Sequence, residues 1–239
     1  MGRERVHHCK KNGCQIPVTT WNSGSSITKR NLMKRFFYLS SLLLHPLWIP
    51  TWILCLWFGT FLSARFGFFG STFGLFLGYE LFFVALIPIL ISFSSRLGQK
   101  TDWEMENVTS RVWPFLIGGI FWLGYTVNLR SELGEMANLI WFTTGSGGIL
   151  LLILSFCYYK GFKVSAHASG WALLIPIFIF NKSLPHELRL VLLMGSIFIC
   201  GIVTGVRWIS GAHQLEELII GLFLGIFIST SFLQTVSML

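Results

Sequence analysis

Long apolar runs separated by short polar segments dominate the chain from residue 37 onward. A helix needs about 20 apolar residues to cross the roughly 30 Å hydrocarbon layer of a bilayer. The runs lack the alternation and turn spacing of a transmembrane barrel, so helices must satisfy the backbone polar groups. The pattern predicts about seven membrane helices, near residues 37–59, 68–95, 113–129, 137–159, 168–181, 189–206 and 214–236.

The fifth run is short for a membrane span and contains Pro176, so a start near Val164 would bring it closer to the required length. The predicted fold class is therefore all-α, a polytopic transmembrane bundle of six to seven helices. A run of small residues, 145–148, is interpreted as a surface where helices approach closely.

Residues 1–36 are polar and basic and show no hydrophobic period. A signal peptide would place a short apolar stretch near its start, whereas the first apolar run begins near Phe36 and is long. We predict a disordered tail over 1–36 and a transmembrane domain over 37–239. The composition, 53% hydrophobic with only 12% charged residues, excludes a soluble enzyme and a wholly disordered chain.

The basic residues fall mostly on one predicted side of the membrane. Threading seven spans places the tail and segments 96–112, 160–167 and 207–213 together, and these carry most of the 18 Lys and Arg. The positive-inside rule makes that side cytoplasmic, in an inner membrane of bacterial type. Topology and anionic lipid account for the net charge of +8, so no nucleic-acid partner is expected. The five scattered cysteines suggest neither disulfides nor zinc.

Three clusters of ionisable residues are the best places to search for function, because such groups are costly near hydrocarbon. Each cluster is separated from the next by a pair of predicted spans, so all three return to the same membrane face. Together they offer cations, a hydroxyl and imidazoles, the groups that can grip a phosphate and attack it without a metal. The first cluster, after the second predicted span, contributes Arg111. The second, after the fourth span, contributes Lys163, Ser165 and His167, and the third, around the start of the seventh, contributes Arg207, His213 and Glu217.

His213 and Glu217 stand four residues apart, one helical turn. The carboxylate can therefore accept a proton from one ring nitrogen and leave the other exposed as a nucleophile. His45-Pro46, inside the first run, is interpreted instead as a kink with a locally paired imidazole, and His7-His8-Cys9 as an incidental cluster in the tail.

Two signatures resemble those of the type 2 phosphatidic acid phosphatase superfamily of membrane lipid phosphatases. The family's third signature is Arg, five residues, His, three residues, Asp. The chain has Arg207-Trp-Ile-Ser-Gly-Ala-His213-Gln-Leu-Glu-Glu217, which keeps the spacing with Glu in place of Asp. The second signature, Pro-Ser-Gly-His, is similar to Val164-Ser165-Ala166-His167.

The family's first signature, Lys, six residues, Arg-Pro, is matched only in part. Arg111 fits its arginine, Glu104 stands where the lysine should be, and Pro114 comes two residues late. Lys100 or Lys163 are the candidates for supplying the missing charge.

The resemblance implies a role for each matched residue. His213 would be the nucleophile that forms a phosphohistidine, oriented by Glu217. Arg111, Ser165 and Arg207, with a weaker contribution from Lys163, would bind the phosphoryl oxygens. His167 would protonate the departing lipid alcohol and then activate water. No metal or cofactor is implied.

The substrate expected from this resemblance is a lipid phosphate: phosphatidic acid, phosphatidylglycerol phosphate, a polyprenyl diphosphate or a lipid A phosphate. A phosphotransferase using the same phosphohistidine stays open, and so does a catalytically weak lipid-phosphate binder or transporter, which Glu104 would favour. A rhomboid-type intramembrane protease is a further alternative, with Ser169 as nucleophile and His213 as base. It leaves Arg111 and Arg207 without roles.

Overall fold

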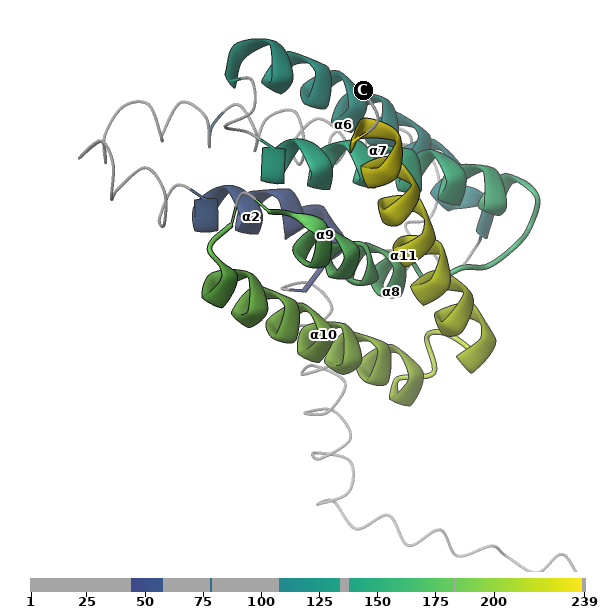
Figure 1. The fold of residues 1–239 in the computed structure, drawn as a ribbon. Coiled ribbons are helices and arrows are strands. Elements are labelled where there is room, and N and C mark those ends of the chain that lie inside the picture. The colour runs from purple at the N-terminus through teal and green to yellow at the C-terminus, as the bar shows by residue number, and fades with distance from the viewer. Residues whose placement is uncertain (1–43, 58–77, 79–107, 134–137, 183, 238–239) are drawn as a thin grey trace, which may run out of the picture. The chain divides into compact units, whose positions relative to one another are not determined.

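The computed structural model describes residues 44–57, 78, 108–133, 138–182 and 184–237, and every regular element within these ranges is a helix. The predicted all-helical class is therefore confirmed for this part of the chain. The tail, residues 1–36, and nearly all of the predicted span 68–95 lie outside it. The elements, drawn in Figure 1, are η1 (Pro46–Trp48), α2 (Ile49–Trp57), η4 (Val108–Arg111), α6 (Val112–Leu133), α7 (Asn138–Tyr159), α8 (Ala166–Ala172), α9 (Leu174–Phe180), α10 (His186–Ile209) and α11 (Leu215–Ser237).

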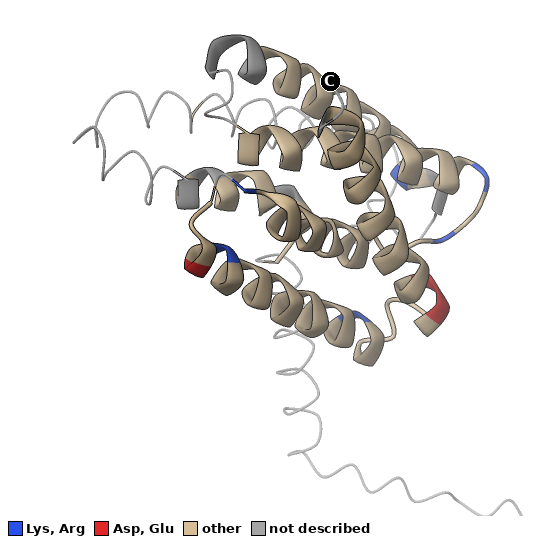
Figure 2. Cartoon of the chain, in the orientation of Figure 1, with Lys and Arg blue, Asp and Glu red and all other residues tan. Residues whose placement is uncertain are grey.

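Three described helices, α7, α10 and the Leu215–Val236 part of α11, are long and apolar enough to cross a membrane. Shorter apolar stretches cover Val112–Asn128 in α6 and Ala166–Phe180 in α8 and α9. Figure 2 shows the charged residues, blue and red, at helix ends and in connections and not in the middles of the helices. This distribution is that of a membrane protein.

The fifth predicted span is two short helices rather than one. It begins at Ala166, midway between the two starts that the sequence allows, and it breaks at Leu173. Pro176 explains the break. A continuous helix would need the missing N–H of Pro176 as a donor to the carbonyl of Ala172, whereas in the first turn of α9 no donor is required there.

Small residues let α6 and α7 pack closely, as the sequence predicts for the run 145–148. A Cβ at Gly148 would lie 2.8 Å from Leu123 Cγ, and one at Gly119 would lie 3.0 Å from the Gly148 carbonyl oxygen. The hydroxyls of Thr126 and Thr144 hydrogen-bond across the same crossing at 2.8 Å. The two backbones approach closely because no larger side chain stands between them.

The short helix α8 is the centre of the described bundle and packs against α7, α10 and α11. Figure 1 shows α8 and α9 enclosed by the longer helices. α11 crosses α8 almost backbone to backbone, because a Cβ at Gly221 would lie 2.7 Å from the Ser165 carbonyl oxygen and one at Gly225 would overlap that of Ser169. This crossing holds the start of α11 against the start of α8.

Candidate functional site

Three connections that are distant in sequence meet at one end of the bundle. They are the η4–α6 junction, the loop between α7 and α8, and the turn between α10 and α11. Arg111 and Arg207 both lie close enough to His213 to act on its charge, and Lys163 contacts Glu217. The structure therefore brings the three ionisable clusters of the sequence into one neighbourhood.

The pair His213 and Glu217 is the best-defined part of this neighbourhood. His213 Nδ1 lies 2.7 Å from Glu217 Oε2, the contact that the four-residue spacing predicts. The same oxygen accepts a hydrogen bond from the backbone N–H of Gln214 at 3.3 Å. Glu217 occupies the third position of α11, so this second bond caps the helix start. One carboxylate thus begins the helix and orients the imidazole.

The turn before α11 depends on a glycine. Gly211 adopts a φ of 71°, a left-handed conformation that other residues rarely take. Its N–H donates to the Trp208 carbonyl at 2.9 Å, and that of Ala212 to the Arg207 carbonyl at 3.2 Å. These bonds close the end of α10 and return the chain so that His213 faces inward, with only 4% of its surface exposed.

Burial lowers the pKa of His213 from 6.5 to about 4, and the positive charges of Arg207 and Arg111 act in the same direction against the opposing contact with Glu217. The imidazole is therefore neutral at pH 7. Because the Glu217 carboxylate accepts from Nδ1, the ring proton sits on Nδ1 and Nε2 keeps its lone pair. A neutral imidazole with a fixed tautomer is the form required of a nucleophile.

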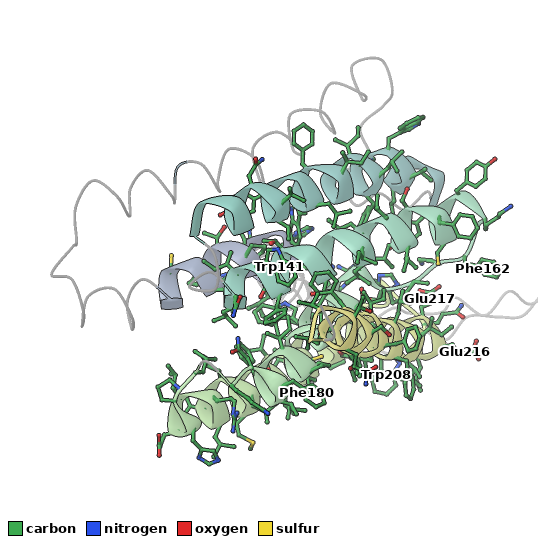
Figure 3. All side chains as sticks on the ribbon, turned by 45° about the horizontal axis from the view of Figure 1, so that its top comes forward. Trp141, Phe162, Phe180, Trp208, Glu216 and Glu217 are labelled. Carbon is green, nitrogen blue, oxygen red and sulfur yellow. The ribbon has the colours of Figure 1, made fainter. Side chains whose placement is uncertain are left out.

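Lys163 contacts the same carboxylate oxygen as His213. Its Nζ lies 3.7 Å from Glu217 Oε2, and about a third of the lysine side chain, 35%, is exposed. The loop that carries Lys163 leaves α7 through Gly161, with a φ of 82°. Figure 3 shows Phe162, next to Lys163 in sequence, at the same end of the bundle as Glu217 and the exposed Glu216.

Ser165 is fully buried and has a structural task. Its hydroxyl caps α8 by accepting from the Ala168 N–H at 3.4 Å. Its own N–H donates to the Glu217 carbonyl oxygen at 3.2 Å. The residue is thus held beside the His213–Glu217 pair by the backbone.

His167 lies in the first turn of α8 and is partly buried. Its ring meets the ring of His45 edge to face, with centroids 4.9 Å apart. His45 also interacts electrostatically with Arg207. The interpretation of His45 as a locally paired kink missed this contact, and no spacing in the sequence indicates it.

Arg111 is almost buried, with 8% of its surface exposed. Its guanidinium carbon lies 5.5 Å from the centre of the Tyr158 ring. The Tyr158 hydroxyl donates in turn to the Val164 carbonyl at 2.7 Å. Tyr158, a second residue that sequence reasoning missed, therefore links Arg111 to the loop that carries Lys163 and Ser165.

Glu104, at the lysine position of the first signature, and Lys100 lie outside the described residues, whereas Pro114 lies in the first turn of α6. Among the side chains that the structure describes, no group of three His, Cys, Asp or Glu could hold a metal ion. Neither a protein-family model, nor a curated protein, nor a solved structure matches the chain.

Proposed function

We propose that the chain is a membrane lipid phosphatase, similar to the type 2 phosphatidic acid phosphatases, that hydrolyses a phosphomonoester or diphosphate of a lipid through a phosphohistidine. The observation that carries this proposal is the buried His213 imidazole. It is neutral, oriented by Glu217 at 2.7 Å, and accompanied by Arg111 and Arg207. A site with an activated nucleophile beside two permanent cations suits phosphoryl transfer.

In the first step of the proposed reaction, Nε2 of His213 attacks phosphorus and the bond from phosphorus to the lipid oxygen breaks. His167 gives its proton to that oxygen, and the lipid alcohol of a phosphomonoester leaves. In a diphosphate the bond that breaks joins the terminal phosphorus to the bridging oxygen, and the lipid monophosphate leaves. Arg111 and Arg207 bind the phosphoryl oxygens, and Ser165 and, more weakly, Lys163 add to this binding. Fixed positive charges in a site with little water stabilise the charge that spreads over those oxygens in the transition state.

In the second step a water molecule attacks the phosphohistidine. His167, now neutral, accepts the proton of that water, the bond from phosphorus to Nε2 breaks, and inorganic phosphate leaves. His213 returns to its neutral form, held by Glu217. A lipid alcohol in place of water would make the same chain a phosphotransferase.

We also propose where the chain and its candidate site lie in the cell. The three apolar helices support an integral membrane protein, and the distribution of basic residues supports an inner membrane with the site on its cytoplasmic side. The substrate is a lipid phosphate of one of the four classes named above. No metal or cofactor takes part in the proposed steps.

The described geometry favours the phosphatase over the protease alternative. Ser169 is fully buried within α8, and its hydroxyl donates to the Ala166 carbonyl at 3.1 Å. The third reading, a binder without turnover, has no need for a nucleophile with an orienting carboxylate.

Phosphate release by detergent-purified protein tests the proposal. A panel of lipid phosphates is offered with EDTA present, and the parent is compared with His213→Ala and with His186→Ala, an exposed histidine at the start of α10 that serves as the matched control. We expect release by the parent and the control and none by His213→Ala. An acid-labile, alkali-stable phosphoprotein should accumulate on rapid quenching. Absence of release from every lipid would overturn the proposal.

A further inference from the structure

The segment just before η1 is fixed on α8 by contacts on both sides of His45. The Trp171 indole Nε1 donates to the Leu44 carbonyl at 2.8 Å. A Cβ at Gly170 would lie 2.5 Å from Pro46 Cβ, so the missing side chain of Gly170 is what lets Pro46 approach α8. The backbone of His45 is therefore held against the helix that carries His167.

Between these two contacts the His45 ring packs on His167. The ring centroids are 4.9 Å apart and the ring planes are inclined by 81°, an edge-to-face arrangement. Arg207 of α10 interacts electrostatically with His45. The pair thus stands inside the candidate site, although the two histidines are 122 residues apart in sequence.

We infer that His45 is a positioning residue for His167, holding the imidazole in the orientation from which it can exchange a proton with the lipid oxygen. This inference rests on the proposed function. An edge-to-face partner restricts rotation of the His167 ring about its side-chain bonds. Fixed orientation matters because a displacement of about 1 Å in a reacting group can cost about 100-fold in rate.

The leaving group distinguishes positioning from a merely structural role. A lipid alkoxide needs a proton in order to leave, whereas nitrophenolate departs without one. We therefore measure the rate of leaving-group release in the first turnover, before the phosphohistidine is hydrolysed. It is measured for a lipid phosphate and for nitrophenyl phosphate. For His45→Ala we expect roughly a 100-fold loss with the lipid and a change within about threefold with nitrophenyl phosphate. His45→Phe, which keeps a ring against His167, should recover most of the lipid rate.

A double substitution adds an independent measurement. If His45 acts through His167, then His45→Ala combined with His167→Ala should be no slower with the lipid than His167→Ala alone. Gly170→Ala, which displaces Pro46, should show the same loss of rate with the lipid and not with nitrophenyl phosphate. It takes the place of His45→Ala in the test if that variant does not fold. His186→Ala again provides the control, with unchanged rates.

Three results would overturn the inference. They are equal losses with both substrates, a further loss in the double variant, and an unchanged lipid rate in both His45→Ala and Gly170→Ala. Failure of the proposed function is distinct from these, since the parent would then form no phosphohistidine with either substrate.

Discussion

The backbone N–H of Ser165 donates to the carbonyl oxygen of Glu217 at 3.2 Å. This bond joins the cap of α8 to the first turn of α11, and the close approach of Gly221 to the Ser165 carbonyl supports the same junction one turn later. The two helices that carry His167 and Glu217 are therefore one rigid unit at this point. The proposed acid and the proposed nucleophile keep their relation through the backbone rather than through side chains alone.

Replacing the Glu217 carboxylate should impair turnover without unfolding the first turn of α11. In Glu217→Gln the amide oxygen can still accept from the Gln214 N–H, but it no longer stabilises the charge that develops on His213. We expect kcat for lipid phosphate to fall by about 100-fold or more, with KM changed little. Steady-state phosphate release measures this.

Glu216→Gln is the matched control, because Glu216 is the exposed neighbour on the same turn. It should keep the parent's kcat. Equal kcat for Glu217→Gln and the parent would show that the contact with His213 has no part in turnover.

The pH dependence of stability follows from the buried imidazole. The pKa of His213 is about 4 in the folded chain against 6.5 for an unperturbed histidine. Between these values the unfolded chain binds the proton that the folded chain refuses, so stability is complete above about pH 6.5 and falls as the pH drops toward 4. Unfolding in detergent should show a steeper loss over this window for the parent than for His213→Gln. Parallel curves would contradict the lowered pKa.

The crossing of α8 and α11 should not tolerate a methyl group. Gly225→Ala would place its Cβ onto the Ser169 carbonyl oxygen, so we expect a destabilisation of about 1–3 kcal/mol, seen as a lower midpoint of thermal unfolding in detergent. Gly205→Ala in α10 is the control, since nothing lies within 4 Å of its added Cβ. An unchanged midpoint for Gly225→Ala would show that the helices can separate without loss.

Lys163 should matter more for substrate than for stability. Its pair with Glu217 is partly exposed, and such pairs contribute about 0–1 kcal/mol to folding. We expect Lys163→Gln to raise KM for lipid phosphate about tenfold, a factor equal to about 1.4 kcal/mol of lost attraction. Lys160→Gln, an exposed lysine three residues earlier whose Nζ lies over the Phe156 and Tyr159 rings, should keep the parent's KM.

Sidedness can be read from the two ends of α10. Lys182 precedes this helix and Ser210 follows it, and both are exposed. In a background without native cysteines, Lys182→Cys should react with an impermeant thiol reagent on intact cells, and Ser210→Cys only after permeabilisation. The opposite pattern would place the candidate site on the outer face, and reaction of both on intact cells would show that α10 does not span.

The sequence by itself determined the helical class, the approximate limits of α7, α10 and α11, and the contact between His213 and Glu217. All of these are local. Apolar length selects a membrane helix, and a spacing of four residues places two side chains on one helical face. Even the glycine-rich run of α7 could be assigned to helix packing, because small residues there leave room for neighbouring helices, whose Trp122 and Phe232 rings lie against Gly147 and Gly145.

The parity of the predicted spans already places the three ionisable clusters on one face, but only the tertiary structure decided which side chains contact each other there. His45 meets His167 because Gly170 lets Pro46 approach, and Tyr158 joins Arg111 to the loop after α7. Lys163, for which the sequence indicates only a weak part in phosphate binding, lies 3.7 Å from the Glu217 carboxylate. These contacts depend on how helices cross, and a crossing is set by the shapes of two surfaces together, which neither stretch of sequence encodes alone.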